Sequence, residues 1–470
     1  MNKTKMVCTI GPSTDEYDKI VKLLKNGMNV ARLNMSHGTL ESHQRTLDLV
    51  KKAREDLNIP CAIMVDTCGP ELRIGTFKNK KVLLKKKQEF TFCTKNVEGD
   101  QNIVYCGYPK LLSILKPHQK LYANNGLLEF TILKLTDTDI ICRVDVGGEL
   151  SDHKSISIPH IRLPLPYISE KDDKNIEFAA INDVEYISAS FVSSGEDIEK
   201  LRACIKKYKG RQNIISKIES AEGIKNLDKI IELSDGIMVA RGDMGTEIPI
   251  EQIPSVQKNM IAKSIKYGKI VIVATEMLES MTYKRRPTRA ETTDVAQAIY
   301  DKTGATMLSG ETASGMYPFE SALTMSKIAK ATEKVIKYEN DFEPNLKSSN
   351  NNLDAISYSA CATASSVGAK AIVCFTDKGK TARMISRFRP RAIIVAVTHD
   401  RFTFNSLALS WGVKPIIVGE TDSLEDMLEN AEKIVKGTKI AKPGDKIVIT
   451  LGVPIAEKGI TNSIKITELS

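Results

Sequence analysis

The chain has 470 residues, enough for more than one domain, and its 42% hydrophobic and 27% charged residues are those of an ordinary globular protein. The nine cysteines form no Cys-x-x-Cys pair and the six histidines show no metal-ligand spacing, which argues against disulfides and zinc and favours oxygen ligands for any metal. The net charge of +9 comes from lysines spread along the chain beside only 6% aromatics, so we expect no nucleic-acid partner and instead sites for anionic metabolites. With no signal peptide and no apolar stretch long enough to span a membrane, we expect a cytoplasmic protein without a membrane partner.

Short apolar runs that end in polar residues recur along the chain, and they are typical of buried parallel β-strands. Amphipathic helical patterns lie between most of them, for example at 17–25, 41–57, 197–207 and 256–266. Eight strand–helix units predict an α/β fold, the (β/α)8 TIM barrel, closed by a helix with Pro318 near its first turn. The eight runs are 6–10, 29–33, 61–66, 184–189, 213–217, 236–240, 270–274 and 305–309.

The stretch between the third and fourth runs has the alternating and β-branched pattern of antiparallel strands. Turn signals such as Asn124-Asn125-Gly126 and Gly147-Gly148 separate its runs. We expect an all-β, barrel-like domain inserted at the active-site end of the barrel, where a lid would sit, with a solvated face of lysines at 78–87. The expected strands are 81–84, 90–93, 121–123, 127–133, 140–146 and 155–158.

A polar segment at 345–352 is typical of a linker, and the chain beyond it alternates helical and strand patterns. A helical pattern at 353–368 precedes expected strands at 371–375, 392–397, 415–418 and 446–451, which predict a smaller, mostly parallel α/β domain. The expected domains are a catalytic barrel (1–69 and 167–344), an inserted lid (70–166) and a C-terminal α/β regulatory domain (353–470).

Two neighbouring strands of the expected barrel end in charged residues. Lys217 and Glu219 are two positions apart, so they share a face of their strand, and Asp243 follows the next strand in a glycine-flanked loop. Because active sites lie at the carboxyl ends of barrel strands, these side chains predict a site, with a structural salt bridge as the alternative. Two carboxylates suit Mg²⁺, and the lysine would offset charge on a phosphoryl group.

The other strand ends add anion- and cation-binding groups. Arg32 and Arg73 would face a phosphate, and the backbone around Gly242 could approach an anion. Thr275 either offers a hydroxyl to the site at Lys217, Glu219 and Asp243 or caps the next helix. Ser309 and Glu311, which follow the eighth strand, allow the same two interpretations. His37 suits a packing or stacking role. Hard oxygen ligands for a cation come from Asn34, Ser36, Asp66 and Thr67.

These motifs, taken in order over nearly the whole chain, resemble the pyruvate kinase family. They are Cys8 to Ser13, Arg32 to Gly38, Asp66 to Arg73, Ser216 to Glu219, Ala240 to Gly245, Ala274 to Met281, Pro287 to Glu291, and Met307 to Ala313. The resemblance implies transfer of the phosphoryl group of phosphoenolpyruvate to ADP, giving pyruvate and ATP, the last step of glycolysis. It also implies Mg²⁺ (or Mn²⁺) and K⁺ as cofactors, allosteric control and a homotetramer.

The resemblance further implies roles for individual residues. Glu219 and Asp243 would hold Mg²⁺, and Lys217 would stabilise the transferring phosphoryl group and the enolate. The substrate carboxylate would meet Gly242, Asp243 and Thr275, which also helps to protonate the enolate carbon. K⁺ would be held by Asn34, Ser36, Asp66 and Thr67. The phosphates would be bound by Arg32, Arg73 and Lys171, the nucleotide base by Pro12 and His37, and Ser309 and Glu311 would support the site.

The sequence departs from the family pattern at three positions near the site: Cys68 replaces the common lysine, Ile74 the common threonine and Glu276 the common glutamine. Glu71 is the residue type that accompanies K⁺ dependence in the family, so we expect activation by K⁺. The family's loop for a phosphorylated effector is represented here by Thr376, Asp377, Lys378, Gly379, Lys380 and Thr381, before a helix expected to reach Arg387 and Arg389. A basic surface turn is the alternative for that loop, because Lys378 replaces a small hydroxyl residue.

Two other functions fit parts of the pattern. An Mg²⁺-dependent lyase or aldolase acting on a pyruvate enolate would also use two carboxylates and a cation, but it would not need the inserted domain or the K⁺ residues. An inactive paralogue that senses phosphoenolpyruvate is suggested only by Cys68 and Glu276.

Overall fold

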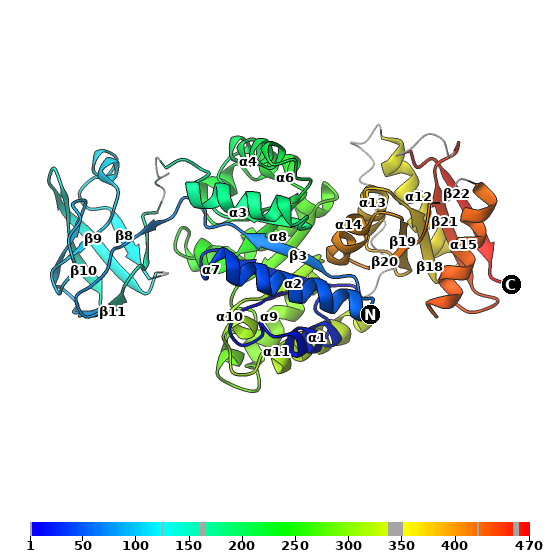
Figure 1. Ribbon diagram of the computed structural model, residues 1–470, viewed down its shortest axis with the longest axis horizontal. Helices are drawn as coiled ribbons and strands as arrows, with labels where there is room; N and C mark the ends of the chain where they lie inside the picture. The colour runs from blue at the N-terminus through cyan, green and yellow to red at the C-terminus, as the bar shows by residue number, and fades with distance from the viewer. Residues whose placement is uncertain are drawn as a thin grey trace.

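The computed structural model describes residues 2–124, 126–159, 161, 165–336, 351–420, 423–454 and 460–470. Three bodies lie in a row, with the barrel in the middle, the β-rich insertion at one end and the C-terminal domain at the other (Figure 1). Of the linker expected at 345–352, only Asn351 and Asn352 lie within the described residues, where they cap and begin helix α12 (Asn352–Ser366).

The central barrel is closed by eight parallel strands in the order β1-β17-β16-β15-β14-β13-β3-β2, so the expected fold class is confirmed. Each strand is buried on both faces, which explains why each reads as a short continuous apolar run. All eight runs form strands, with ends shifted by at most two residues. They are β1 (Lys5–Thr9), β2 (Val30–Asn34), β3 (Ala62–Asp66), β13 (Tyr186–Ala189), β14 (Asn213–Ile218), β15 (Gly236–Ala240), β16 (Ile270–Ala274) and β17 (Ala305–Leu308).

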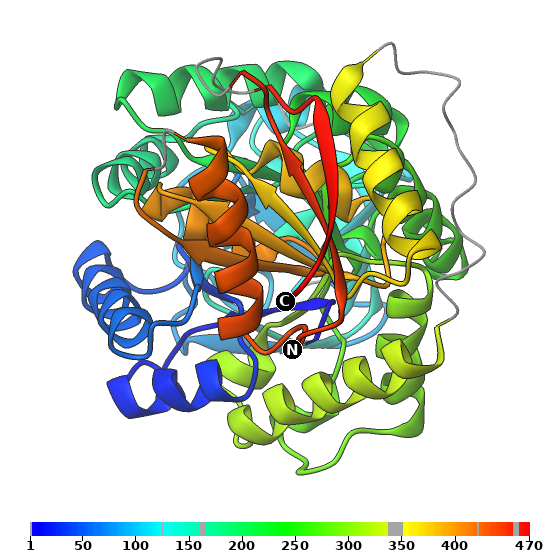
Figure 2. The same cartoon turned by 90° about the vertical axis from the view of Figure 1, so that its right-hand side faces the viewer.

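Helices surround the barrel, as the view from the C-terminal domain shows (Figure 2). Hydroxyl side chains of Thr39, Ser169 and Thr288 cap α2, α3 and α9, and Pro318 stands in the first turn of α11 as expected. The longer helices are α1 (Tyr17–Lys25), α2 (Leu40–Asp56), α3 (Glu170–Ile181), α4 (Gly195–Lys207), α6 (Leu227–Leu233), α8 (Ile253–Lys266), α9 (Arg289–Tyr300) and α11 (Pro318–Val335). The short ones are α5 (Ala221–Lys225), α7 (Arg241–Met244), α10 (Gly310–Ala313), η2 (Ile250–Gln252) and η3 (Glu279–Thr282).

The insertion is an all-β domain with its own core, in which the rings of Phe90, Phe92 and Phe130 pack together. A seven-stranded sheet runs β4-β12-β8-β9-β10-β6-β7, and β11 pairs with β5 beside it. The strands are β4 (Leu72–Arg73), β5 (Lys81–Leu84), β6 (Glu89–Cys93), β7 (Ile103–Tyr105), β8 (Lys120–Ala123), β9 (Leu128–Leu135), β10 (Asp139–Val146), β11 (Gly148–Ser151) and β12 (Ser155–Ser157); η1 is Pro109–Ser113.

The sequence pattern missed three short strands, β4, β7 and β11. Gly147 and Gly148 were expected to form a turn, but Gly148 begins β11. Gly147 allows a close approach of backbones, since a Cβ there would lie 2.4 Å from the carbonyl oxygen of Leu84. The lysines at 78–87 are exposed, as expected.

The C-terminal domain has a five-stranded sheet in the order β20-β19-β18-β21-β22. Strands β18 (Ala371–Phe375), β19 (Ile393–Thr398), β20 (Val413–Ile417) and β21 (Lys446–Leu451) are parallel, and β22 (Ser463–Glu468), which the sequence pattern missed, is antiparallel. The remaining helices are α13 (Lys380–Ser386), α14 (Arg401–Ser406), η6 (Leu407–Leu409) and α15 (Leu424–Gly437). The helix expected to reach Arg389 ends at Ser386, and Arg389 itself has a left-handed φ of 49°.

The C-terminal domain closes the amino end of the barrel. Leu409 packs within the hydrophobic cluster that fills the barrel interior, alongside Met238 and Ile270. The Tyr186 hydroxyl donates to the carbonyl oxygen of Ser406 (2.7 Å), and Lys5 Nζ donates to that of Val413 (2.7 Å). These contacts close the barrel interior at this end.

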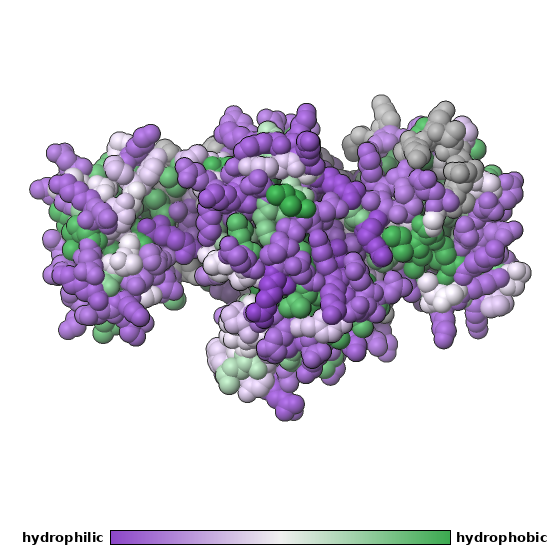
Figure 3. All heavy atoms as spheres, viewed as in Figure 1, coloured by the Kyte–Doolittle hydropathy of each residue, from purple (hydrophilic) through white to green (hydrophobic). Residues whose placement is uncertain are grey.

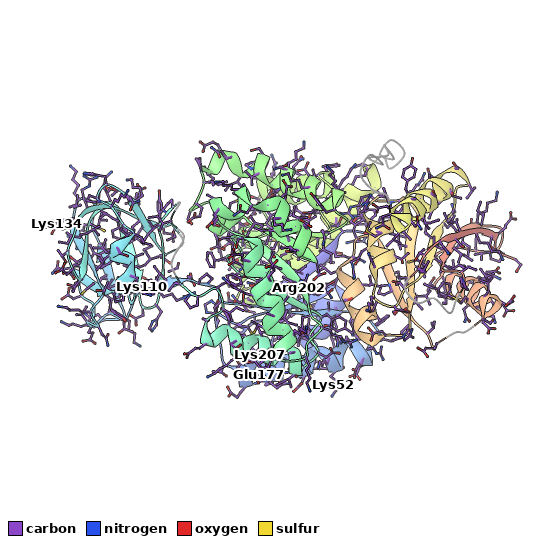
Figure 4. The ribbon with its side chains drawn as sticks, turned by 90° about the horizontal axis from the view of Figure 1, so that it is seen from above. Lys52, Lys110, Lys134, Glu177, Arg202 and Lys207 are labelled. Carbon is purple, nitrogen blue, oxygen red and sulfur yellow. The ribbon has the colours of Figure 1, made fainter. Side chains whose placement is uncertain are left out.

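The surface is largely polar. The face in Figure 3 is mostly hydrophilic. Among the charged side chains labelled in Figure 4, Lys110 and Lys134 lie on the outside of the insertion, and Arg202 and Lys207 lie on the outside of helix α4. Among the described helices, none has the length and apolar character needed to cross a membrane.

Candidate active site

Lys217 lies at the centre of a cluster of charged side chains at the carboxyl ends of β3 and β14. Its Nζ is 2.9 Å from Glu219 Oε1 and 3.5 Å from Asp66 Oδ1, and it donates to Ser190 Oγ at 2.8 Å. As expected, Lys217 and Glu219 point the same way from their strand. Both carboxylates are 1% exposed, so water screens these ion pairs little.

Arg32 joins this cluster from the neighbouring strand β2. Its guanidinium contacts Asp66 Oδ2 through both Nε (2.8 Å) and Nη2, and its Nη1 donates to Thr9 Oγ1 at 2.9 Å. The register of β2 and β3 brings Arg32 and Asp66 together, because Asp66 is the direct partner of Asn34, two residues after Arg32 on β2. Two cations and two carboxylates are thus held together at one end of the barrel.

The charges in the cluster shift one another's pKa values. Burial alone would lower the pKa of Lys217, but attraction to Asp66 and Glu219 outweighs it, so the pKa is raised and the amine is protonated. Burial alone would raise the pKa of Asp66, yet Arg32 and Lys217 lower it below the ordinary value. Glu219 differs, because burial and nearby Asp243 raise its pKa to about 7 against the opposing effect of Lys217.

Gly242 and Asp243 lie in a single helical turn, α7, and not in the loop that the sequence predicts. The Gly242 N–H donates to Thr275 Oγ1 at 2.8 Å, which brings β15 and β16 together at their ends. Thr275 therefore does not cap a helix: its hydroxyl donates to the carbonyl oxygen of Ala274 (2.6 Å), and the next helical turn is preceded by Leu278.

The loop that carries Thr275 is held in an unusual backbone conformation. Thr275 and Glu276 have left-handed φ angles of 66° and 55°, a strained arrangement for non-glycine residues. Arg241 stabilises it, because its Nη2 donates to the Thr275 carbonyl oxygen (2.6 Å) while its Nη1 pairs with Asp294 (2.6 Å). On the other side, Glu311 accepts N–H bonds from Leu278 (3.1 Å) and Ser309 (2.7 Å) and supports the same loop.

The four expected K⁺ ligands lie at the ends of β2 and β3. Asn34 Oδ1 accepts the Ser36 N–H (3.2 Å), and Thr67 Oγ1 accepts the Ser190 N–H (3.1 Å). Asp66 Oδ1 is buried and has no hydrogen-bond partner among the described residues. The set consists entirely of oxygen atoms, as a hard cation requires.

A second group of cations surrounds His37, where the insertion approaches the barrel. The pKa of His37 is lowered by burial first and then by Arg73, Lys171, Arg32 and Lys154. Arg73, on β4, pairs with Glu71 (2.7 Å) and donates to the His153 carbonyl oxygen (2.9 Å). Pro12 lies exposed in the loop after β1, at the same end of the barrel.

Lys154 was missed by the sequence reasoning. It lies between β11 and β12, directly after Asp152 and His153. Its position just before a predicted strand gave no sign that it would face the barrel.

The three departures from the family pattern occupy different environments. Cys68 is half-buried, and its pKa is raised by burial and by Asp172, so its thiol is uncharged where the family has a lysine. Ile74 is 2% exposed in the core of the insertion. Glu276 is exposed at the rim.

A cleft of about 590 Å³ opens between the base of the insertion and the barrel. Its lining includes Leu72 and Ile156 from the insertion, and Tyr167, Glu219 and Asp243 from the barrel. The volume lies in the range of small-metabolite sites.

In the described part of the chain no three His, Cys, Asp or Glu side chains form a preformed metal cage, so a metal here would take ligands from substrate and water.

Comparisons with known proteins match nearly the whole chain. The family described as "Pyruvate kinase, barrel domain" matches residues 1–322, and "Pyruvate kinase, alpha/beta domain" matches 354–467. A pyruvate kinase of Clostridium perfringens is 43% identical, covering 100% of both chains, and one of Staphylococcus aureus is 41% identical over 99% of this chain and 80% of its own. A crystal structure of a pyruvate kinase from Cryptosporidium parvum superposes with a TM-score of 0.94 at 36% identity, covering 100% of this chain and 96% of that one. The chain belongs to the pyruvate kinase family.

Proposed function

We propose that the chain works in the cytoplasm and transfers the phosphoryl group of phosphoenolpyruvate to ADP, giving pyruvate and ATP in the last step of glycolysis. The observation that carries the proposal is the position of Lys217, protonated and held between Asp66 and Glu219, of which Glu219 lines the cleft. Two anionic substrates must be brought together, so neutralisation of charge is the main catalytic task.

Mg²⁺ or Mn²⁺ fits the carboxylates at the cleft. Glu219 Oε1 is buried and faces Lys217 as an ion pair, yet it has no hydrogen-bond partner of good geometry among the described residues. Glu219 and Asp243 would hold the metal, which would supply positive charge to the phosphoryl and enolate oxygens.

K⁺ is the proposed second cation, held by Asn34, Ser36, Asp66 and Thr67. Asp66 Oδ1 supports it, because this buried atom has an ion pair with Lys217 but no hydrogen bond among the described residues. Glu71 at the base of the insertion, whose pKa is raised chiefly by burial, supports it too. We expect turnover to be higher in K⁺ than in Na⁺ at equal ionic strength. Equal turnover in the two buffers would contradict this assignment.

The residues of this chain divide the remaining work. Lys217 and Arg32 would bind the phosphoryl group, and the Gly242 N–H and the Thr275 hydroxyl would receive the substrate carboxylate, with Thr275 also helping to place a proton on the enolate carbon. Ser309 and Glu311 support the loop that bears Thr275.

ADP would enter from the side where the insertion approaches the barrel. Arg73, Lys171 and Lys154 would contact its phosphates, and Pro12 and His37 would border its base. Closure of the insertion over the cleft would exclude water and so prevent hydrolysis of the phosphoryl donor.

The C-terminal domain would carry regulation. The loop of Thr376, Lys378, Gly379, Lys380 and Thr381 would take a phosphorylated effector, with Gly379 at a left-handed φ of 76° and the Thr381 hydroxyl bonded to that of Thr461 (2.8 Å). If sugar phosphates and AMP leave the half-saturating phosphoenolpyruvate concentration unchanged, this proposal is wrong. We also propose a homotetramer, which a mass measurement in solution would test.

The decisive experiment mixes phosphoenolpyruvate, ADP and Mg²⁺ and follows ATP and pyruvate. We expect Lys217→Met to lose at least about 100-fold in kcat, as removal of a group that stabilises transition-state charge does. Lys207→Met is the matched control, because Lys207 is exposed on α4 and pairs with Asp173, outside the cluster around Lys217. A silent wild type that still binds phosphoenolpyruvate would favour the sensor function, and full activity of Lys217→Met would refute the role of the lysine.

A further inference from the structure

The two chain segments that connect the insertion to the barrel meet at one buried carboxylate, Asp172. The outgoing segment donates two backbone N–H groups to it, from Cys68 to Oδ1 (2.8 Å) and from Gly69 to Oδ2 (2.9 Å). The returning segment donates the Ser169 hydroxyl to Oδ2 (3.2 Å). Asp172 is 2% exposed, so a full set of hydrogen bonds compensates for its burial.

Helix capping does not explain this carboxylate. The cap of α3 is the Ser169 hydroxyl, which accepts the Asp172 N–H at 3.0 Å. The Asp172 side chain also accepts from Asn175 Nδ2 of its own helix (3.2 Å), but both backbone N–H groups that it accepts belong to a segment about a hundred residues earlier in the chain.

One peptide group links Asp172 to the catalytic lysine. The N–H of the Thr67–Cys68 peptide donates to Asp172, and the carbonyl of the same peptide accepts from Ser190 Oγ at 2.7 Å. Ser190 Oγ in turn accepts from Lys217 Nζ at 2.8 Å. Hydrogen bonds at both ends of a peptide group polarise it and strengthen one another.

The segment around this peptide has little freedom to move independently. Ser190, 2% exposed, also donates its N–H to Thr67 Oγ1 (3.1 Å), so it is bonded to Thr67 at two points. Gly69 has a left-handed φ of 73°, and a Cβ there would lie 2.9 Å from both Phe191 Cδ2 and Ser190 Cβ.

We propose that Asp172 is a positioning residue that, through the Thr67–Cys68 peptide and Ser190, sets the place of Lys217 according to the position of the insertion's hinge. The inference rests on the proposed function, in which Lys217 acts on the transferring phosphoryl group. A rotation of the insertion about this hinge turns the peptide that Ser190 contacts, and so the hydroxyl that holds Lys217 Nζ moves with it.

The test uses the full chain with Asp172→Asn and Ser190→Ala, singly and together. Asp172→Asn keeps the size of the side chain but places an NH₂ group where one backbone N–H now donates. Glu185→Gln is the matched control, because Glu185 is also a buried carboxylate (1% exposed) that accepts a backbone N–H, from Ile63 at 2.7 Å, but has no bond to Ser190 or Lys217. Two experiments are run: amide exchange at Cys68 and Gly69 is followed without substrate, and steady-state kinetics give kcat and KM for phosphoenolpyruvate.

We expect Asp172→Asn to speed amide exchange at Cys68 and Gly69 and to lower kcat by about 10-fold to 100-fold, the usual effect of losing a supporting partner. KM should change much less, because Arg32 and Gly242 still bind the substrate. The double variant should fall no further than the worse single one, since both changes break the same chain of bonds. Glu185→Gln should keep kcat even if its thermal midpoint falls.

Several outcomes would overturn the inference. A kcat within about twofold of the wild type in Asp172→Asn, or multiplicative effects in the double variant, would show that Asp172 is only structural. If Asp172→Asn does not fold, the Ser190→Ala variant is the test. An unchanged kcat in Ser190→Ala would refute the proposal that hydrogen bonds through Ser190 position Lys217. A wild type that makes no ATP refutes the proposed function instead, and amide exchange at Cys68 and Gly69 still tests the anchor.

Discussion

Replacing Lys5 with methionine should change the free energy of unfolding by an amount that depends on pH. Lys5 is 2% exposed where the barrel meets the C-terminal domain, and its Nζ donates to the Val413 carbonyl oxygen. Burial lowers the pKa of Lys5 from 10.5 to about 8, with only a small opposing attraction from Glu333.

The size of the effect follows from that pKa. The unfolded chain binds the proton more tightly than the folded chain, so the charged amine lowers the free energy of unfolding by about 3 kcal/mol at pH 7. This penalty disappears as pH rises from about 8 to 10.5, which leaves about 1.4 kcal/mol at pH 9.5. Methionine carries no charge but leaves the Val413 carbonyl without its donor, a cost of about 1–3 kcal/mol that does not depend on pH. The variant's stability relative to the wild type should therefore fall by about 2 kcal/mol between pH 7 and pH 9.5.

The single tryptophan provides the assay. Trp411 is 5% exposed at the same junction, with Lys3 Nζ and Arg389 Cζ 5.2 Å and 4.8 Å from its ring, so its fluorescence reports unfolding there. Urea unfolding of wild type and Lys5→Met is compared at pH 7 and pH 9.5, with Lys229→Met, an exposed lysine, as control. A difference between Lys5→Met and wild type that is equal at the two pH values would refute the reasoning.

Three further changes test other parts of the structure. Leu409→Ala should lower the free energy of unfolding by about 2–5 kcal/mol through the cavity left in the barrel, and a loss below about 1 kcal/mol in the urea assay would contradict the seal described here. Gly69→Ala should cost about 1–3 kcal/mol of stability, because its methyl group would lie 2.9 Å from Phe191 Cδ2 at a left-handed φ; unchanged urea unfolding would count against it. Lys154→Met should raise KM for ADP but not for phosphoenolpyruvate, and an unchanged KM for ADP would show that Lys154, though near His37, does not contact the nucleotide.

The barrel was predictable because its signal is strong. Parallel strands such as β15 (Gly236–Ala240) are buried on both faces, so they appear as continuous apolar runs that end where the chain meets the site. The antiparallel strand β22 has mostly exposed and half-exposed residues, and β7 has only three residues, so neither stands out from its surroundings.

Only those parts of the site that lie at the ends of β-strands could be predicted from the sequence. The shared direction of Lys217, on β14, and Glu219, directly after it, follows from β-geometry, as does the register of Asn34 with Asp66. The left-handed φ of Thr275 does not, because no sequence pattern distinguishes it from a helix cap, and its stabilising Arg241–Asp294 ion pair joins elements more than fifty residues apart.

Asp172 was missed for a similar reason. In the sequence it belongs to the first turn of a helix, where an acidic residue is common and needs no further explanation. Its partners at Cys68 and Gly69 become neighbours only once the insertion leaves and re-enters the barrel at one place.

The insertion of Leu409 into the barrel has a consequence for the order in which the chain folds during synthesis. All eight barrel strands have been made by Leu308, but the interior they enclose is completed only by a side chain a hundred residues later. Until residue 409 leaves the ribosome, Met238 and Ile270 face an open end of the barrel. We therefore expect the nascent barrel to remain loosely packed, and a ribosome stalled soon after residue 336 to hold a chain that proteases cleave readily.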